Sequence, residues 1–109
     1  MANKIRVLVK EPGKEPEVRE IEHTLEGMRA VVEGYIECPP SELNGLGVDL
    51  WANEEGKLNG LAPNITLFGG RDVVVGTVFL AANDGEGATI GLSDEQVEAA
   101  RAWLAERTL

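Results

Sequence analysis

The sequence predicts an α+β fold: a single domain over residues 1–109, with five to six mostly antiparallel strands and two helices packed on one face of the sheet. Three observations support this prediction. The length of 109 residues suits one domain and is too short for two. Short strand-like runs are separated by turns rich in Gly, Pro and Asn. Two segments, one beginning at Thr24 and one at Ser93, carry apolar residues at helical spacing instead.

The chain begins with a predicted strand hairpin. In residues 4–10 the apolar positions recur at every second residue, which is typical of a half-buried strand. Pro12 and Gly13 then favour a type II turn, because Pro presets one backbone angle and Gly tolerates the positive one that follows. Residues 17–22 are short, acidic and weakly apolar, so we expect an edge strand there.

A short helix and a short strand are predicted next. The helix begins at Thr24 and ends near Gly34, and its apolar residues share one face. Gly27 inside this helix lowers helix stability by about 1 kcal/mol relative to Ala. A close approach of the helix to a strand would explain why Gly stands at this position. Residues 35–38 form a short strand that the following prolines end. Cys38 is expected to be a small buried apolar residue.

Residues 47–82 form the stretch around which the chain is organised. Residues 48–52 alternate in character, and residues 73–81 are almost continuously apolar, which predicts a central strand buried on both faces. Gly76 would mark a bulge or a close backbone approach within that strand. The intervening polar loop is expected to be irregular, with a few of its apolar residues plugging one end of the core. Residues 88–91 are expected to return as a short last strand.

The C-terminal segment carries the clearest helix signal. Ser93 and Gln96 have the spacing of a capping box, in which each side chain satisfies a free backbone N–H group of the other residue. The apolar face of the predicted helix consists of Val97, Ala100, Trp103 and Leu104.

Composition excludes several classes of protein. The formal net charge of -9 argues against direct nucleic-acid binding, which requires clustered Lys and Arg. No apolar run reaches the roughly 20 residues of a membrane span. One Cys and one His cannot form an internal disulfide or a zinc cluster. The low cysteine count and the absence of a secretory leader lead us to expect a cytoplasmic protein.

Several segments together resemble one known family. They are KIRVLVKEPGKEPEVREIE, GYIECPP, NEEGKLNGLAPN, DVVVGTVFLAANDGEG and LSDEQVEAARAWL. In this order they are similar to the domain of unknown function 3846 family of small uncharacterised bacterial, phage and mobile-element proteins. The resemblance implies a compact cytoplasmic α+β protein of the kind that phages and integrated elements encode. It implies no activity, because the family supplies no established catalytic residues.

The loop at residues 53–64 is the predicted ligand-binding site, since loops held by a rigid sheet often carry function. Its polar side chains and two neighbouring aromatic rings would contact a ligand: Asn53, Glu54, Glu55, Lys57, Asn59, Asn64, Tyr35 and Trp51. The alternative is that Asn and Gly stand here for turn geometry alone. No catalytic residue, metal ligand or cofactor is assigned.

Three functions remain open from the sequence. The first is a non-catalytic binding or interaction module for an unknown protein or small-molecule partner. The second is a small enzyme that acts on a nucleotide-like or peptide-like substrate at the 53–64 loop. The third is an acidic mimic of nucleic acid, whose binding would weaken as salt rises. An exposed edge strand would also permit a homodimer.

Overall fold

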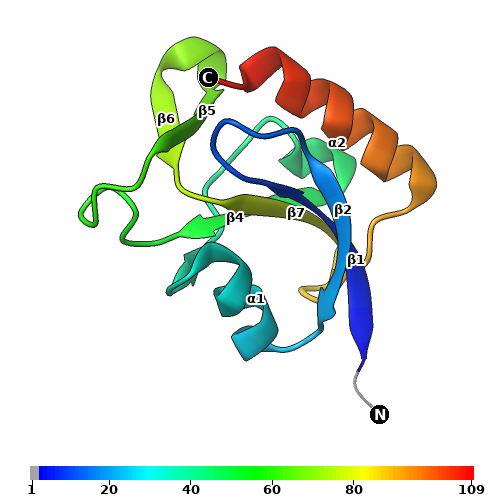
Figure 1. Ribbon diagram of the computed structural model, residues 1–109. Coiled ribbons are helices and arrows are strands. Elements are labelled where there is room, and N and C mark those ends of the chain that lie inside the picture. Colours follow the sequence, from blue (N-terminus) through cyan, green and yellow to red (C-terminus); the bar gives the residue numbers. More distant parts are fainter. Residues whose placement is uncertain (1–2) are drawn as a thin grey trace.

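The computed structural model, which describes residues 3–109, confirms an α+β fold built around a six-stranded antiparallel sheet (Figure 1). Five strands lie side by side in the order β2-β1-β7-β4-β3, and the short β8 pairs with β7. The strands of this sheet are β1 (Lys4–Lys10), β2 (Glu17–Glu22), β3 (Ile36–Glu37), β4 (Val48–Asn53), β7 (Val78–Asn83) and β8 (Thr89–Ile90). The helices are α1 (Leu25–Val32) and α2 (Asp94–Arg107).

A separate two-stranded ribbon replaces part of the expected central strand. It consists of β5 (Pro63–Leu67) and β6 (Asp72–Val75), joined by the 3-10 turn η2 (Phe68–Gly70). The prediction of one strand over residues 73–81 is therefore wrong, because the chain turns at Gly76, whose φ is 79°. The positive φ at this position favours glycine, and a Cβ atom there would also lie 2.7 Å from Leu61 Cδ1.

The two helices lie on opposite faces of the sheet, and the expectation of a single covered face is wrong (Figure 1). The reason lies in the central strand β7, where Val78, Leu80 and Ala82 point to one face and Phe79 and Ala81 to the other. All five side chains are buried. Because successive side chains in a strand alternate between faces, an apolar strand of this kind requires a cover on each side.

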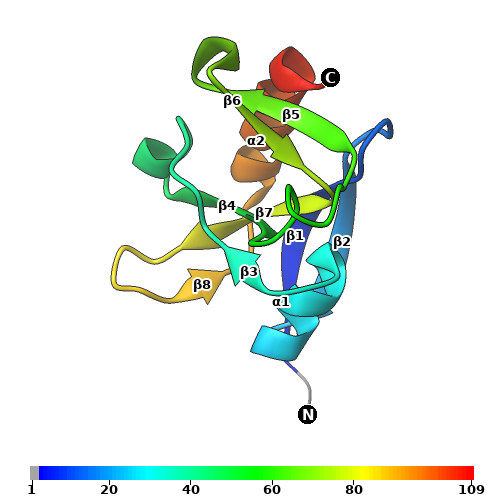
Figure 2. The same ribbon diagram turned by 90° about the vertical axis from the view of Figure 1, so that its left-hand side faces the viewer.

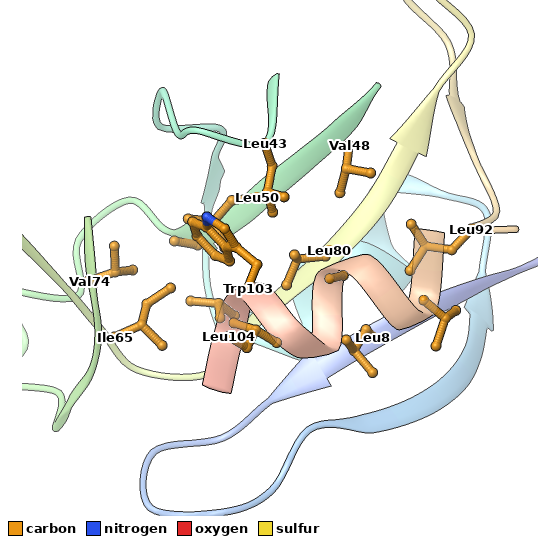
Figure 3. Packing of buried hydrophobic residues seen from close by; sticks show 14 of the residues in the cluster. Leu8, Leu43, Val48, Leu50, Ile65, Val74, Leu80, Leu92, Trp103 and Leu104 are labelled. Atoms are coloured by element: carbon orange, nitrogen blue, oxygen red, sulfur yellow. The ribbon is translucent and has the colours of Figure 1, made fainter. Parts of the chain in front are cut away.

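The larger core lies beneath α2 (Figure 3). All four residues of the predicted apolar face of α2 are buried there, against Leu8 of β1 and Leu50 of β4. The β5–β6 ribbon closes the same layer, with Ile65 and Leu67 fully or almost fully buried. Figure 2 shows the ribbon at the α2 end of the molecule, above the sheet.

The smaller core lies beneath α1, where Met28 and Val32 contact the other face of the sheet. Gly27 lies against the edge strand β2: a Cβ atom at this position would be 2.4 Å from the carbonyl oxygen of Glu22. The predicted close approach explains why a poor helix former stands inside this short helix.

Local end signals are confirmed at both helices. The Thr24 side chain accepts a hydrogen bond from the backbone N–H of Gly27 at the start of α1. Ser93 and Gln96 form the full capping box at the start of α2. Within residues 3–109, no helix is long and apolar enough to cross a bilayer.

Candidate functional site

The pairing of β3 with β4 brings part of the predicted site together. Ile36 lies opposite Asn53 in the strand register. The backbone N–H of Glu54 donates to the carbonyl of Tyr35 over 2.8 Å. Tyr35, Asn53, Glu54 and Glu55 are therefore neighbours, although almost twenty residues separate Tyr35 from the others in sequence. Tyr35 is 55% exposed, and the Arg29 guanidinium lies over its ring, 4.2 Å from the ring centre.

Asn53 holds the local structure together instead of facing solvent. It is only 6% exposed, and its Nδ2 donates to the carbonyl of Val32 at the end of α1 over 3.0 Å. Its Oδ1 accepts from the backbone N–H of Glu55 over 2.8 Å, which closes the turn after β4. Gly34 allows this contact, since a Cβ atom there would lie 2.6 Å from Asn53 Nδ2. Both the nitrogen and the oxygen of the Asn53 amide thus form hydrogen bonds within the chain.

Asn64 is fully buried and links three parts of the fold. Its Nδ2 donates to the carbonyls of Lys10 and Gly76, each over 2.8 Å. Its Oδ1 accepts from Lys10 Nζ over 3.1 Å. The hydrogen bonds of Asn53 thus close a turn, whereas those of Asn64 join distant segments of the core.

Two other predicted loop residues, Glu54 and Lys57, border a small hollow between the loop and β6, called here the β6 hollow. Its volume is about 140 Å³. Its polar lining consists of Glu37, Asn53, Glu54, Lys57 and Asp72. Lys57 Nζ lies 3.1 Å from Asp72 Oδ1 and so joins the loop to β6. Leu58 also lines the hollow and is 85% exposed.

The β6 hollow is electrostatically acidic. Three carboxylates line it, whereas its only lining cation, Lys57, is already paired with Asp72. The hydrogen bond from Lys57 lowers the pKa of Asp72, and the hydrogen bond from the Val73 N–H acts in the same direction. The Asp72 carboxylate is thus held in its charged form.

Five of the eight predicted residues do not line the hollow: Tyr35, Trp51, Glu55, Asn59 and Asn64. Trp51 stacks on Phe79 beneath α1, with ring centres 6.3 Å apart. Its Nε1 is buried and has no hydrogen-bond partner among the described residues. Asn59 is exposed in the loop, where its backbone N–H donates to the carbonyl of Glu55.

Glu37 and Asp72 line the hollow but were not among the predicted site residues. Glu37 reaches it through the pairing of β3 with β4, and Asp72 through the turn of the β5–β6 ribbon. Both depend on contacts between segments distant in sequence, so no local spacing marks them. The one signal in the sequence concerns Asp72, whose charge is opposite to that of Lys57, fifteen positions earlier.

Cys38 is exposed, and the expectation that it is buried is wrong. The strand β3 ends at Glu37, one residue before it, so the alternation that would turn Cys38 inward stops. Partial desolvation, and to a lesser degree the charge of Asp49, raises the pKa of Cys38 to about 11. The thiol is therefore protonated at neutral pH and a weak nucleophile. No group of three or more His, Cys, Asp or Glu side chains among residues 3–109 is arranged to hold a metal ion.

The family described as "Domain of unknown function (DUF3846)" matches residues 5–105. No curated protein and no solved structure matches the chain.

Proposed function

Because the chain belongs to the DUF3846 family, whose description assigns no activity, we propose a function from geometry and charge: a non-catalytic module that binds a basic segment of a partner protein at the β6 hollow. One observation carries the proposal. Glu37, Glu54 and Asp72 surround a hollow that contains only one cation, and that cation is already paired. The hollow therefore has negative charge to offer and little positive charge of its own.

The size of the hollow indicates what enters it. Small-molecule sites typically enclose about 300–1,000 Å³, whereas the β6 hollow encloses about 140 Å³. The hollow is thus smaller than a usual small-molecule site, and its size matches the end of one long side chain. An Arg side chain suits it well, since its planar guanidinium forms paired hydrogen bonds with carboxylates. Its apolar stem would lie along Leu58 and Val73, which also line the hollow.

The surroundings of the hollow favour the same partner. Glu55 is exposed on the adjacent turn, and the exposed residue Tyr35 is joined to Glu54 by a backbone hydrogen bond. Aromatic rings attract guanidinium groups, as the contact of Arg29 with Tyr35 already illustrates. The net charge of -9 would steer a basic partner toward the protein over longer distances.

A titration with defined peptides tests this proposal. The probe is a short unstructured Arg-containing peptide, and a peptide with every Arg replaced by citrulline, its neutral isostere, serves as the ligand control. We expect saturable binding of the Arg peptide, with NMR shifts at residues 37, 54 and 72–75. Glu54→Gln should weaken it about two- to fivefold, the range of an exposed ion pair.

Glu20→Gln is the matched protein control, because it removes the same charge from an exposed position of β2 outside the hollow. Equal weakening by Glu54→Gln and Glu20→Gln would contradict the proposed site and favour the diffuse charge of a nucleic-acid mimic. Equal binding of the Arg and citrulline peptides would contradict the proposed basic partner.

A further inference from the structure

A second and larger hollow runs along α2, opposite the turn that joins β1 to β2, and is called here the α2 groove. Its volume is about 680 Å³, within the usual range for small-molecule sites. Three of the ten Lys and Arg residues of the chain line it: Lys10, Lys14 and Arg101. The carboxylates of Glu15 and Glu98 also line it. The lining thus carries one net positive charge in a strongly acidic protein.

Lys10 is the unusual member of this group, because it is only 1% exposed. Its Nζ donates to the carbonyl of Glu11 over 2.9 Å and to Oδ1 of Asn64 over 3.1 Å. An ammonium group has three donors, so one remains, and both acceptors are neutral. Within residues 3–109 no carboxylate lies at ion-pair distance from Lys10. Burial lowers the pKa of Lys10, and the charge of the more distant Glu15 opposes this effect.

The two other cations lie on the open side of the groove. Arg101 is exposed and in no ion pair within the described part of the chain, and its Nη1 donates to the carbonyl of Pro16 over 3.1 Å. That contact uses one of its five N–H donors. Lys14 is exposed, and its Nζ is 3.6 Å from Glu11 Oε1, a weak contact at the surface. The lining thus combines one buried ammonium with two exposed cations that retain free donors.

We propose that the α2 groove binds a small monocarboxylate with an apolar body. Arg101 and Lys14 contact the carboxylate, and Lys10 supports its charge from beneath. Pro16, Ala102 and Ala105 line the groove and receive the apolar body. The single net positive charge of the lining favours a singly charged ligand, since Glu15 and Glu98 repel a phosphate dianion. This site is separate from the β6 hollow and independent of the function proposed there.

The test is an NMR titration of the whole chain with sodium benzoate at constant ionic strength. Benzamide has the same shape without the charge, and inorganic phosphate supplies an oxyanion of higher charge. We expect benzoate to shift the amide signals of residues 10–16 and 98–108 to saturation. Benzamide should bind at least about tenfold more weakly, since charge-assisted hydrogen bonds are lost. Phosphate should bind more weakly than benzoate.

Arg101→Gln should weaken benzoate binding about tenfold. Arg71→Gln is the matched control, because Arg71 is exposed and does not line the groove. Binding of benzoate should be unchanged in that variant. The absence of saturable shifts, equal binding of benzamide, tighter binding of phosphate, or equal loss in both variants would each overturn the proposal.

Discussion

Replacement of Asn64 by Ala should be among the most damaging single substitutions in this chain. The change removes three hydrogen bonds, to the carbonyls of Lys10 and Gly76 and from Lys10 Nζ. Asn64 is fully buried, so water does not readily replace its amide. A buried polar group left without its partner costs about 1–3 kcal/mol. We therefore expect a loss of about 3–5 kcal/mol, a large part of the roughly 5–15 kcal/mol that stabilises a typical domain.

Urea unfolding, followed by circular dichroism, measures this loss. The midpoint should fall while the slope stays unchanged, because the surface exposed on unfolding is nearly the same. Asn59→Ala is the control: it makes the same change at an exposed position of the same loop and should alter stability by no more than about 0.5 kcal/mol. A loss below about 1 kcal/mol for Asn64→Ala would refute the reasoning, since the three bonds would then contribute little.

Three further predictions follow from individual contacts. Gly27→Ala should lower the unfolding midpoint although Ala favours helices, because its Cβ would lie 2.4 Å from the Glu22 carbonyl oxygen. Lys57→Met should raise the pKa of Asp72 toward its ordinary value of 3.8, which carboxyl NMR can follow. In the unchanged protein, the lowered pKa of Asp72 stabilises the fold above a pH of about 4. This stabilisation is lost as the pH falls through the folded-state pKa. Alkylation of Cys38 should be slow at neutral pH despite its exposure, and its rate should rise up to a pH of about 11.

Each of these predictions has a control. Gly45→Ala places a Cβ atom in open space, so a loss as large as that of Gly27→Ala would contradict the steric argument. In the Lys57→Met variant the pKa of Asp84 should not move, because backbone hydrogen bonds from Glu86 and Ala88 lower it; an equal shift would indicate a general charge effect. The urea-unfolded chain should alkylate faster than the folded chain at pH 8, and equal rates would refute the influence of the fold on Cys38.

Features that depend on neighbours in sequence were predictable. The capping box of Ser93 and Gln96 lies within one helical turn, so its spacing alone identifies it. The same holds for the buried face of α2, whose residues repeat at helical period. The strand limits of β1 and β2 match the predicted ranges, because alternation of apolar residues extends over both segments.

The site was less predictable, because one residue type serves two purposes. Asn53, Asn59 and Asn64 look alike in sequence, since Asn suits turns and can equally bind a ligand. The structure separates them by burial: Asn53 and Asn64 hold the chain together, whereas Asn59 is exposed. Glu54 and Lys57 remain candidates because they line the hollow, which also includes Glu37 and Asp72.

The stretch from residue 47 to residue 82 shows which features local sequence patterns predict and which they do not. Sequence alone determined that it carries the most apolar strand and a polar loop, because period and turn composition are local properties. Only the tertiary structure decided that the strand turns at Gly76, that the helices cover opposite faces, and that Asn64 is buried against Lys10. The physical reason is that these outcomes depend on contacts between segments far apart in the chain, and the free energy of such contacts is not encoded in any local pattern.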